Sequence, residues 1–125
     1  MEVQFTRSIK IILRDDDIME TGPKGSDVIE INLEFAKENV EKIRNLKKGR
    51  RFIIIHISNG QMTQEARKYF GEADLKFEKV AILAKGPLQR LVGNFFLGIN
   101  KPSSPIKLFT KKEKVLEWFY PEKDS

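Results

Sequence analysis

Cysteine is absent from the 125 residues, and histidine occurs once, as His56. Without cysteine the chain has no disulfide bond, no thiolate nucleophile and no Cys-based metal site. A single histidine does not supply the nucleophile–base pairs that most covalent catalysis uses. The sequence also lacks a phosphate-binding glycine loop, a His-Glu-x-x-His pair and a Gly-x-Ser-x-Gly elbow. We therefore predict that the protein is not an enzyme and that it holds no metal and no cofactor.

Long apolar runs are absent as well. No stretch approaches the ~18 apolar residues that span a bilayer, and the N-terminal residues lack the pattern of a signal peptide. The sequence thus predicts a cytoplasmic protein without a membrane partner. With 40% hydrophobic and 33% charged residues, the composition is that of a globular protein rather than a disordered one. The length fits a single domain spanning residues 1–125.

The net charge of +5 is unevenly distributed along the chain. Residues 1–43 hold 6 Lys/Arg and 10 Asp/Glu, whereas residues 44–125 hold 17 and 8. Such asymmetry can mark a nucleic-acid face, but no aromatic-and-basic strand motif of an RNA binder accompanies it. Lysines that keep helix surfaces and strand edges solvated explain the excess better. We therefore do not expect nucleic acid as a partner. The three aspartates at residues 15–17 are interpreted as a charged hairpin turn rather than a cation site.

The central feature of the chain is residues 51–70. A run of apolar, mostly β-branched residues at 52–57 predicts a strand covered on both faces, as in a parallel sheet between helices. His56 alone interrupts this run, and alternation along a strand places it on one face with Phe52 and Ile54. We expect His56 to be a largely buried core residue with a hydrogen-bonded ring nitrogen. Turn residues then lead to Thr63, which is placed to cap a helix.

The same periodicities predict the other elements. Further strands are expected at residues 5–13, 18–21, 80–84 and 106–109. Helices are expected after Asn32, after Thr63, over residues 88–99, and after residues 110–113, which are interpreted as a capping box. Buried strands that alternate with helices predict an α/β fold with about four helices. The strands at 52–57, 80–84 and 106–109 are expected to lie parallel and central in the sheet. The predicted parts are an antiparallel N-terminal strand pair (5–21), an α/β core (28–119) and a charged tail (120–125).

Two surfaces are candidates for function. Ligands of open α/β sheets bind at the carboxyl ends of the strands, where polar residues could hold a small anion or a nucleotide. These candidate ligand residues are His56, Ser58, Asn59, Gly60, Lys85 and Gly86. The same residues could equally be the polar residues that loops at this edge of a sheet ordinarily carry, without any role in binding.

The second candidate surface is the predicted helix over residues 88–99. Its apolar residues exceed the stripe of about 100° that a surface helix needs, and Arg90 is its one charged residue. Its outer side is therefore covered either by the chain itself or by a protein partner or second copy. The candidate interface residues are Leu88, Phe95, Phe96 and Leu97.

Three segments, together with the order of the elements, resemble a known family. They are the 52–58 strand running into Met62-Thr63-Gln64-Glu65-Ala66-Arg67, the 80–83 strand, and the segment Pro105-Ile106-Lys107-Leu108-Phe109-Thr110. This pattern resembles the bacterial STAS-like domains, which are related to the anti-anti-sigma factors of sporulation, and in particular their uncharacterised single-domain relatives.

The resemblance implies a mixed α/β sheet of the STAS-like kind and a non-catalytic regulatory or protein-interaction role, with another protein or a second copy as partner. In anti-anti-sigma factors a partner kinase phosphorylates a serine at the N-terminus of the helix after the central strand, typically preceded by Asp. That Asp-Ser pair is missing here. The hydroxyls near the corresponding position are Ser58 and Thr63, which are the candidate phosphorylation sites.

Overall fold

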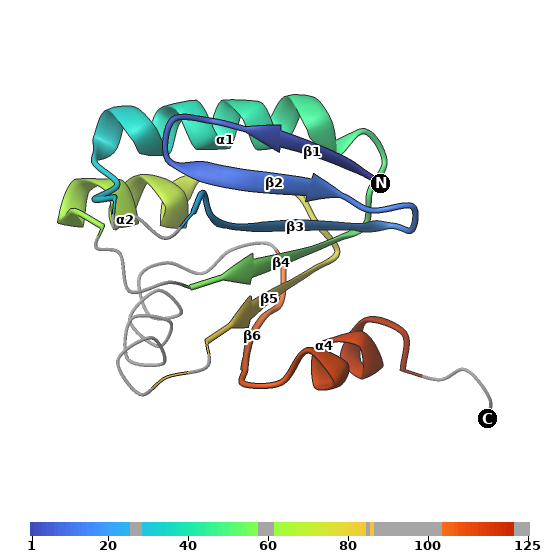
Figure 1. Ribbon diagram of the computed structural model, residues 1–125. Helices are drawn as coiled ribbons and strands as arrows, with labels where there is room; N and C mark the ends of the chain where they lie inside the picture. Colours follow the sequence, from blue (N-terminus) through green and yellow to red (C-terminus); the bar gives the residue numbers. More distant parts are fainter. Residues whose placement is uncertain (26–28, 58–61, 85, 87–103, 122–125) are drawn as a thin grey trace.

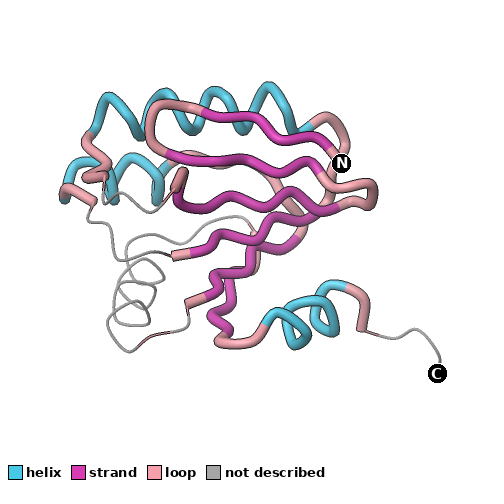
Figure 2. The backbone as a smooth tube through the Cα atoms, in the orientation of Figure 1, coloured by secondary structure: helices cyan, strands magenta, loops and turns pink. Residues whose placement is uncertain are grey.

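The computed structural model describes residues 1–25, 29–57, 62–84, 86 and 104–121 (Figure 2). Within these residues the chain forms a six-stranded sheet and three helices (Figure 1). None of these helices is long and apolar enough to cross a membrane. The fourth helix expected from the sequence, over 88–99, lies outside the described residues.

The sheet is mixed, as the sequence predicted. Its strands are β1 (Glu2–Phe5), β2 (Ile9–Leu13), β3 (Ile18–Pro23), β4 (Phe52–His56), β5 (Lys79–Leu83) and β6 (Ile106–Phe109). They lie side by side in chain order; the β1–β2 and β2–β3 pairs are antiparallel and the later pairs are parallel. The prediction that β6 is a central strand was wrong, because the sequential order makes it an edge strand of the sheet that the described residues form.

The N-terminal region differs from the single strand predicted over residues 5–13. The chain starts earlier in β1, turns, and returns as β2. Thr6 makes this turn, because its hydroxyl accepts hydrogen bonds from the backbone N–H groups of Ser8 and Ile9. Side-chain hydroxyls compete with strand pairing in this way, and strand periodicity alone does not reveal it.

The helices are α1 (Leu33–Lys47), α2 (Gln64–Glu72) and α4 (Lys112–Phe119). The predicted caps of the first two are confirmed: Asn32 accepts from the Phe35 N–H, and Thr63 accepts from the Ala66 N–H. The capping box predicted for the last helix was wrong. Its N-cap is Lys111, which makes no side-chain cap bond, because the chain stays extended for one residue beyond Thr110.

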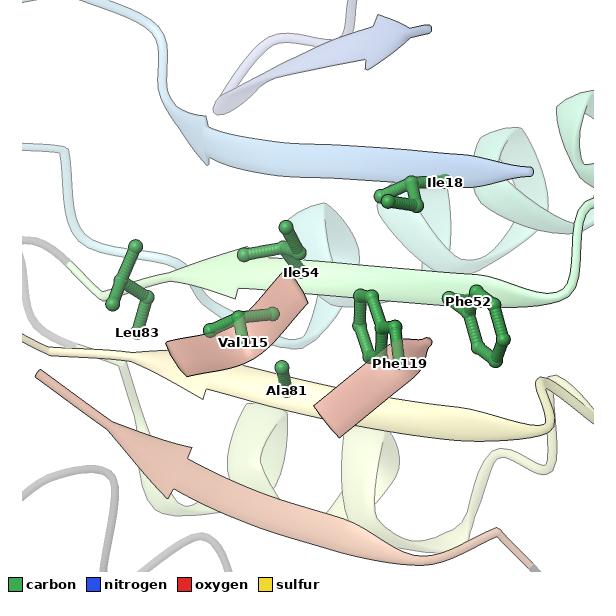
Figure 3. Packing of buried hydrophobic residues seen from close by; sticks show 7 residues of the cluster. All are labelled: Ile18, Phe52, Ile54, Ala81, Leu83, Val115 and Phe119. Atoms are coloured by element: carbon green, nitrogen blue, oxygen red, sulfur yellow. The ribbon is translucent and has the colours of Figure 1, made fainter. Parts of the chain in front are cut away.

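The helices divide between the two faces of the sheet. Helices α1 and α2 lie on one face, and α4 crosses the other (Figures 1 and 3). The face under α1 buries Ile11, Leu13, Met19, Ile43, Ile53 and Phe77. The face under α4 buries Ile18, Phe52, Ile54, Ala81, Leu83, Val115 and Phe119 (Figure 3). Central strands are therefore covered on both sides, which explains their continuous apolar sequences.

Side chains on the α4 side can be followed across the whole sheet. Paired residues of neighbouring strands point to the same face. Val3 pairs with Ile12, Ile12 with Glu20, and Glu20 with Ile54, which is part of the α4 core. The face that α4 covers at β4 and β5 therefore continues to Val3 on β1, where the side chain is exposed. Glu20 is the last buried residue along this row, since Ile12 is half-buried and Val3 is exposed.

Candidate functional site

A buried carboxylate lies on the α4 side of β3. Glu20 alternates with Ile18 and therefore points to the same face as the α4 core. Only 5% of the residue is accessible to solvent, and it is the one buried charged residue in the described part of the chain. A buried charge is costly unless it is paired and hydrogen-bonded, so its partners define the site.

Three basic side chains from three different elements surround this carboxylate. Arg14, just beyond β2, donates from Nη1 to Oε2 at 2.7 Å. His56, at the end of β4, places Nε2 2.7 Å from Oε1. Lys112, in the first turn of α4, places Nζ 2.8 Å from Oε2. Glu20 thereby joins two strands and the only described helix on this side of the sheet.

The electrostatics of Glu20 follow from this arrangement. Burial by itself would raise the pKa of the Glu20 carboxyl, because desolvation penalises the charged form. The hydrogen bonds from His56, Lys112 and Arg14 outweigh that effect and hold the pKa far below its ordinary value of 4.5. Glu20 is therefore ionised over the whole physiological range, and a carboxylate with so low a pKa is a weak proton acceptor.

Gly22 provides the space that His56 occupies. A Cβ at position 22 would lie 3.2 Å from the His56 Cβ, which is tighter than most real contacts. In the parallel register, residues 22 and 56 come next after the Thr21–Ile55 pair and share one face. The missing side chain thus lets the imidazole lie against β3, within reach of Glu20.

An open cleft of about 590 Å³ adjoins this cluster. It is lined by Met1, Ile12, Arg14, Asp15, Asp16, Glu20 and Lys112. The charges in this lining are already paired, since the N-terminal amine contacts Asp15 at 2.9 Å and Arg14 also contacts Asp16 at 2.9 Å. The positive and negative side chains that line the cleft therefore neutralise one another, and the cleft does not present an excess of either charge. Within the described residues, no group of three or more His, Asp or Glu side chains could hold a metal ion.

Apolar side chains are exposed on the same face beside the cleft. Met1 is 80% exposed, Val3 45% and Phe5 51%. Val3 and Phe5 alternate along β1, so both point to the α4 side of the sheet. We refer to Met1, Val3 and Phe5 as the β1 patch. Contiguous exposed apolar patches are one signature of surfaces that bind another protein.

The prediction for His56 was half right. Its ring nitrogen is hydrogen-bonded, as expected, and it shares a face with Phe52 and Ile54. It is not largely buried, because 31% of its side chain remains exposed. The reason is its position at the end of β4, next to a charged cluster rather than in the centre of the apolar core.

Most of the other predicted site residues lie outside the described part of the chain. These are the ligand-loop residues Ser58, Asn59, Gly60 and Lys85 and the interface residues Leu88, Phe95, Phe96 and Leu97. Gly86 is described and half-buried. Thr63 uses its hydroxyl to cap α2, and its phosphorylation stays a prediction.

Sequence reasoning missed Glu20, Arg14 and Lys112 as members of one site. One signal was present: alternation places Glu20 on one strand face with Ile18, as it places His56 on one face with Ile54. Two polar side chains that face the same core suggest a buried pair. The sequence could not show that β3 and β4 are neighbours with Glu20 opposite Ile54, which brings the two side chains together.

A family model described as "Domain of unknown function (DUF7793)" matches residues 13–123, which is nearly the whole chain. The chain belongs to this family. The match starts at the last residue of β2 and includes Arg14, Glu20, His56 and Lys112, so the charged cluster lies within the family domain, whereas β1 lies before it. A search of curated proteins finds no match for this DUF7793 sequence.

One solved structure shows the fold of the DUF7793 domain. An uncharacterised protein of the DUF3478 family from Shewanella loihica PV-4, with a SpoIIAA-like fold, is similar over 89% of this chain and 91% of that chain. The identity is 23% and the TM-score 0.58. A protein of unknown function from Arthrobacter sp. FB24 matches 90% of this chain and 92% of its own at 22% identity, with a TM-score of 0.33. The first match confirms the STAS-like fold that the sequence suggested.

Proposed function

We propose that this DUF7793-family chain is a non-catalytic protein-interaction module of the STAS-like kind and that it binds its partner through the β1 patch. The observation that carries the proposal is the exposure of Val3 and Phe5 on β1, an edge strand of the described sheet. An edge strand offers unpaired backbone groups to a partner, and exposed apolar side chains add the buried area that gives affinity.

The charged cluster supports the non-catalytic part of the proposal. Glu20 is fully engaged by Arg14, His56 and Lys112, and its pKa is held low. A general acid or base works best with a pKa near the working pH. The cluster is better suited to stabilising the fold, because it joins α4 to the strands on the boundary between the core and the β1 patch.

Site-specific photocrosslinking in living cells tests the proposal. A benzophenone amino acid replaces Phe5 in one variant and Lys68, an exposed residue of α2, in a matched control. We expect a light-dependent protein adduct of defined mass from position 5 and none from position 68. Equal adducts at both positions, or none at position 5, would contradict the proposal.

A further inference from the structure

We propose that the partner of the β1 patch is a second copy of this chain, joined by antiparallel pairing of β1 with the partner's β1 around a two-fold axis at Val3. The inference rests on the proposed function, since it names the protein that the β1 patch binds. The joined sheet would continue through both copies. Three independent features of β1 support this pairing: the direction of its backbone hydrogen-bonding groups, the order of its side chains and its contrast with the opposite edge.

The backbone of β1 presents its hydrogen-bonding groups in the required pattern. The N–H of Thr6 donates to the carbonyl of Ile9, so residue 6 faces β2. In an antiparallel pair, successive residues turn their N–H and C=O groups to alternate sides. Phe5 and Val3 are one and three residues away from Thr6. Their backbone groups therefore point away from β2, toward the outer edge of the sheet, where a further strand would pair.

The order of side chains in β1 is self-complementary. A two-fold axis perpendicular to the sheet keeps the α4 sides of both copies on one face, so odd-numbered residues oppose odd-numbered ones. With the axis at Val3, Val3 opposes the partner's Val3, and Phe5 opposes the partner's Met1. The β1 patches of the two copies then merge into one apolar cluster, which is the arrangement that isologous interfaces need.

The opposite face of β1 fits the same register. There Glu2 opposes the partner's Gln4, and Gln4 opposes the partner's Glu2. In the single chain the Gln4 amide already donates to the Glu2 carboxylate. Pairing would exchange this bond within one strand for two equivalent bonds between the copies, without placing like charges opposite each other.

The other edge of the sheet has the features that discourage pairing. Strand β6 carries an exposed lysine, Lys107, in its middle, and it follows Pro105 directly. Natural edge strands use lysine and proline in this way to prevent association. Strand β1 contains neither lysine nor proline. Of the two outer strands of the described sheet, β1 is therefore the one suited to pairing.

The first test changes the residue on the proposed axis. Val3→Lys places two like charges directly opposite each other, and its fold should be intact because Val3 is half-exposed. Sedimentation velocity between about 1 µM and 1 mM protein should show a concentration-dependent dimer for the unchanged chain. We expect Val3→Lys to raise the dissociation constant at least about tenfold. Glu72→Gln, which changes the net charge equally at an exposed site on α2, should leave it unchanged.

The second test reads the register. The chain has no cysteine, so a single introduced thiol reports one position. At the proposed axis the Cα atoms of the two copies lie about 5.5 Å apart, a distance that permits a disulfide. Val3→Cys should therefore form a covalent dimer under mild oxidation. Gln4→Cys should not, because its two copies would lie more than about 7 Å apart.

The outcomes separate the inference from the proposed function. A monomer at all concentrations, with no disulfide from Val3→Cys, overturns self-pairing. If position 5 nevertheless crosslinks to another protein in cells, the proposed function stands with a different partner. If Gln4→Cys crosslinks and Val3→Cys does not, the register centred on Val3 is wrong. If the unchanged chain dimerises but both cysteine variants fail to crosslink, β1 is not the interface.

Discussion

The two halves of the sheet face on the α4 side have opposite character. Under α4 the face is buried and aromatic: the rings of Phe52 and Phe119 stack with centroids 4.5 Å apart, and Tyr120 meets Phe52 edge-on at 5.3 Å. At β1 the same face is exposed and carries Val3 and Phe5. One continuous surface of one sheet therefore serves as core at one end and as solvent-facing apolar surface at the other.

The boundary between the halves shows how such a division is made. Glu20 lies at this boundary and contacts three basic side chains, one of which, Lys112, belongs to α4. The ion pair fixes the start of the helix at this point, and the aromatic residues at the end of α4 cover β4 and β5. Phenylalanine therefore has a different environment on each side: Phe52 and Phe119 are buried in the core under α4, whereas Phe5 is exposed at β1.

Removing one phenylalanine ring from each half should give the largest difference in the free energy of unfolding. Phe119→Ala should lower the free energy of unfolding by about 3–5 kcal/mol, because it removes a buried, stacked ring and leaves a cavity. Phe5→Ala, the same change at the exposed end, should alter it by less than about 0.5 kcal/mol. Urea unfolding of both variants measures the difference. Similar losses in both would mean that the β1 patch is part of the core.

Neutralising the boundary carboxylate should have an intermediate effect. Glu20→Gln keeps the shape of the side chain but removes the carboxylate that pairs with Lys112 and one of the two carboxylates that pair with Arg14. We therefore expect a loss of about 2 kcal/mol at pH 7. Glu41→Gln, at an exposed position of α1, is the control and should cost less than about 0.5 kcal/mol. An unchanged stability of Glu20→Gln would show that the cluster contributes nothing net.

The pH dependence of stability, measured for the unchanged chain and for Glu20→Gln, tests whether the charge of Glu20 causes the loss. The folded pKa of Glu20 lies below the ordinary 4.5, so ionised Glu20 stabilises the fold above pH 4.5, and this stabilisation is lost as the pH falls further. The stability difference between the unchanged chain and Glu20→Gln should therefore be constant near neutral pH and shrink below about pH 4.5. A difference that stays constant down to pH 3 would indicate a packing effect instead.

The glycine that makes room for His56 should give the smallest effect. Gly22→Ala forces a Cβ to within 3.2 Å of the His56 Cβ, and we expect a loss of about 1 kcal/mol as the imidazole is displaced. Gly25→Ala is the matched control, because nothing lies within 4 Å of its added Cβ. It should be neutral or slightly stabilising. Equal effects at both positions would mean that the approach of β3 to His56 is not constrained.

Local chemistry in the sequence was sufficient for much of the fold. The apolar runs of β4, β5 and β6 and the caps Asn32 and Thr63 depend on neighbours within a few residues, and they were predicted correctly. The hairpin at Thr6 and the start of α4 were not. Both depend on which of several competing local hydrogen bonds forms, and that choice is made when the segment packs against the rest of the chain.

The site shows the same limit more sharply. Side-chain alternation is a local property, so the sequence determined that Glu20 shares a strand face with Ile18 and that His56 shares one with Ile54. Only the tertiary structure decided that they meet, because β3 and β4 become neighbours only after α1 returns the chain to the sheet. Arg14 and Lys112 join from positions 98 residues apart. Only the assembled sheet decided which apolar side chains α4 covers, and so left Val3 and Phe5 exposed, because burial depends on the surface of a neighbouring element and not on hydrophobicity alone.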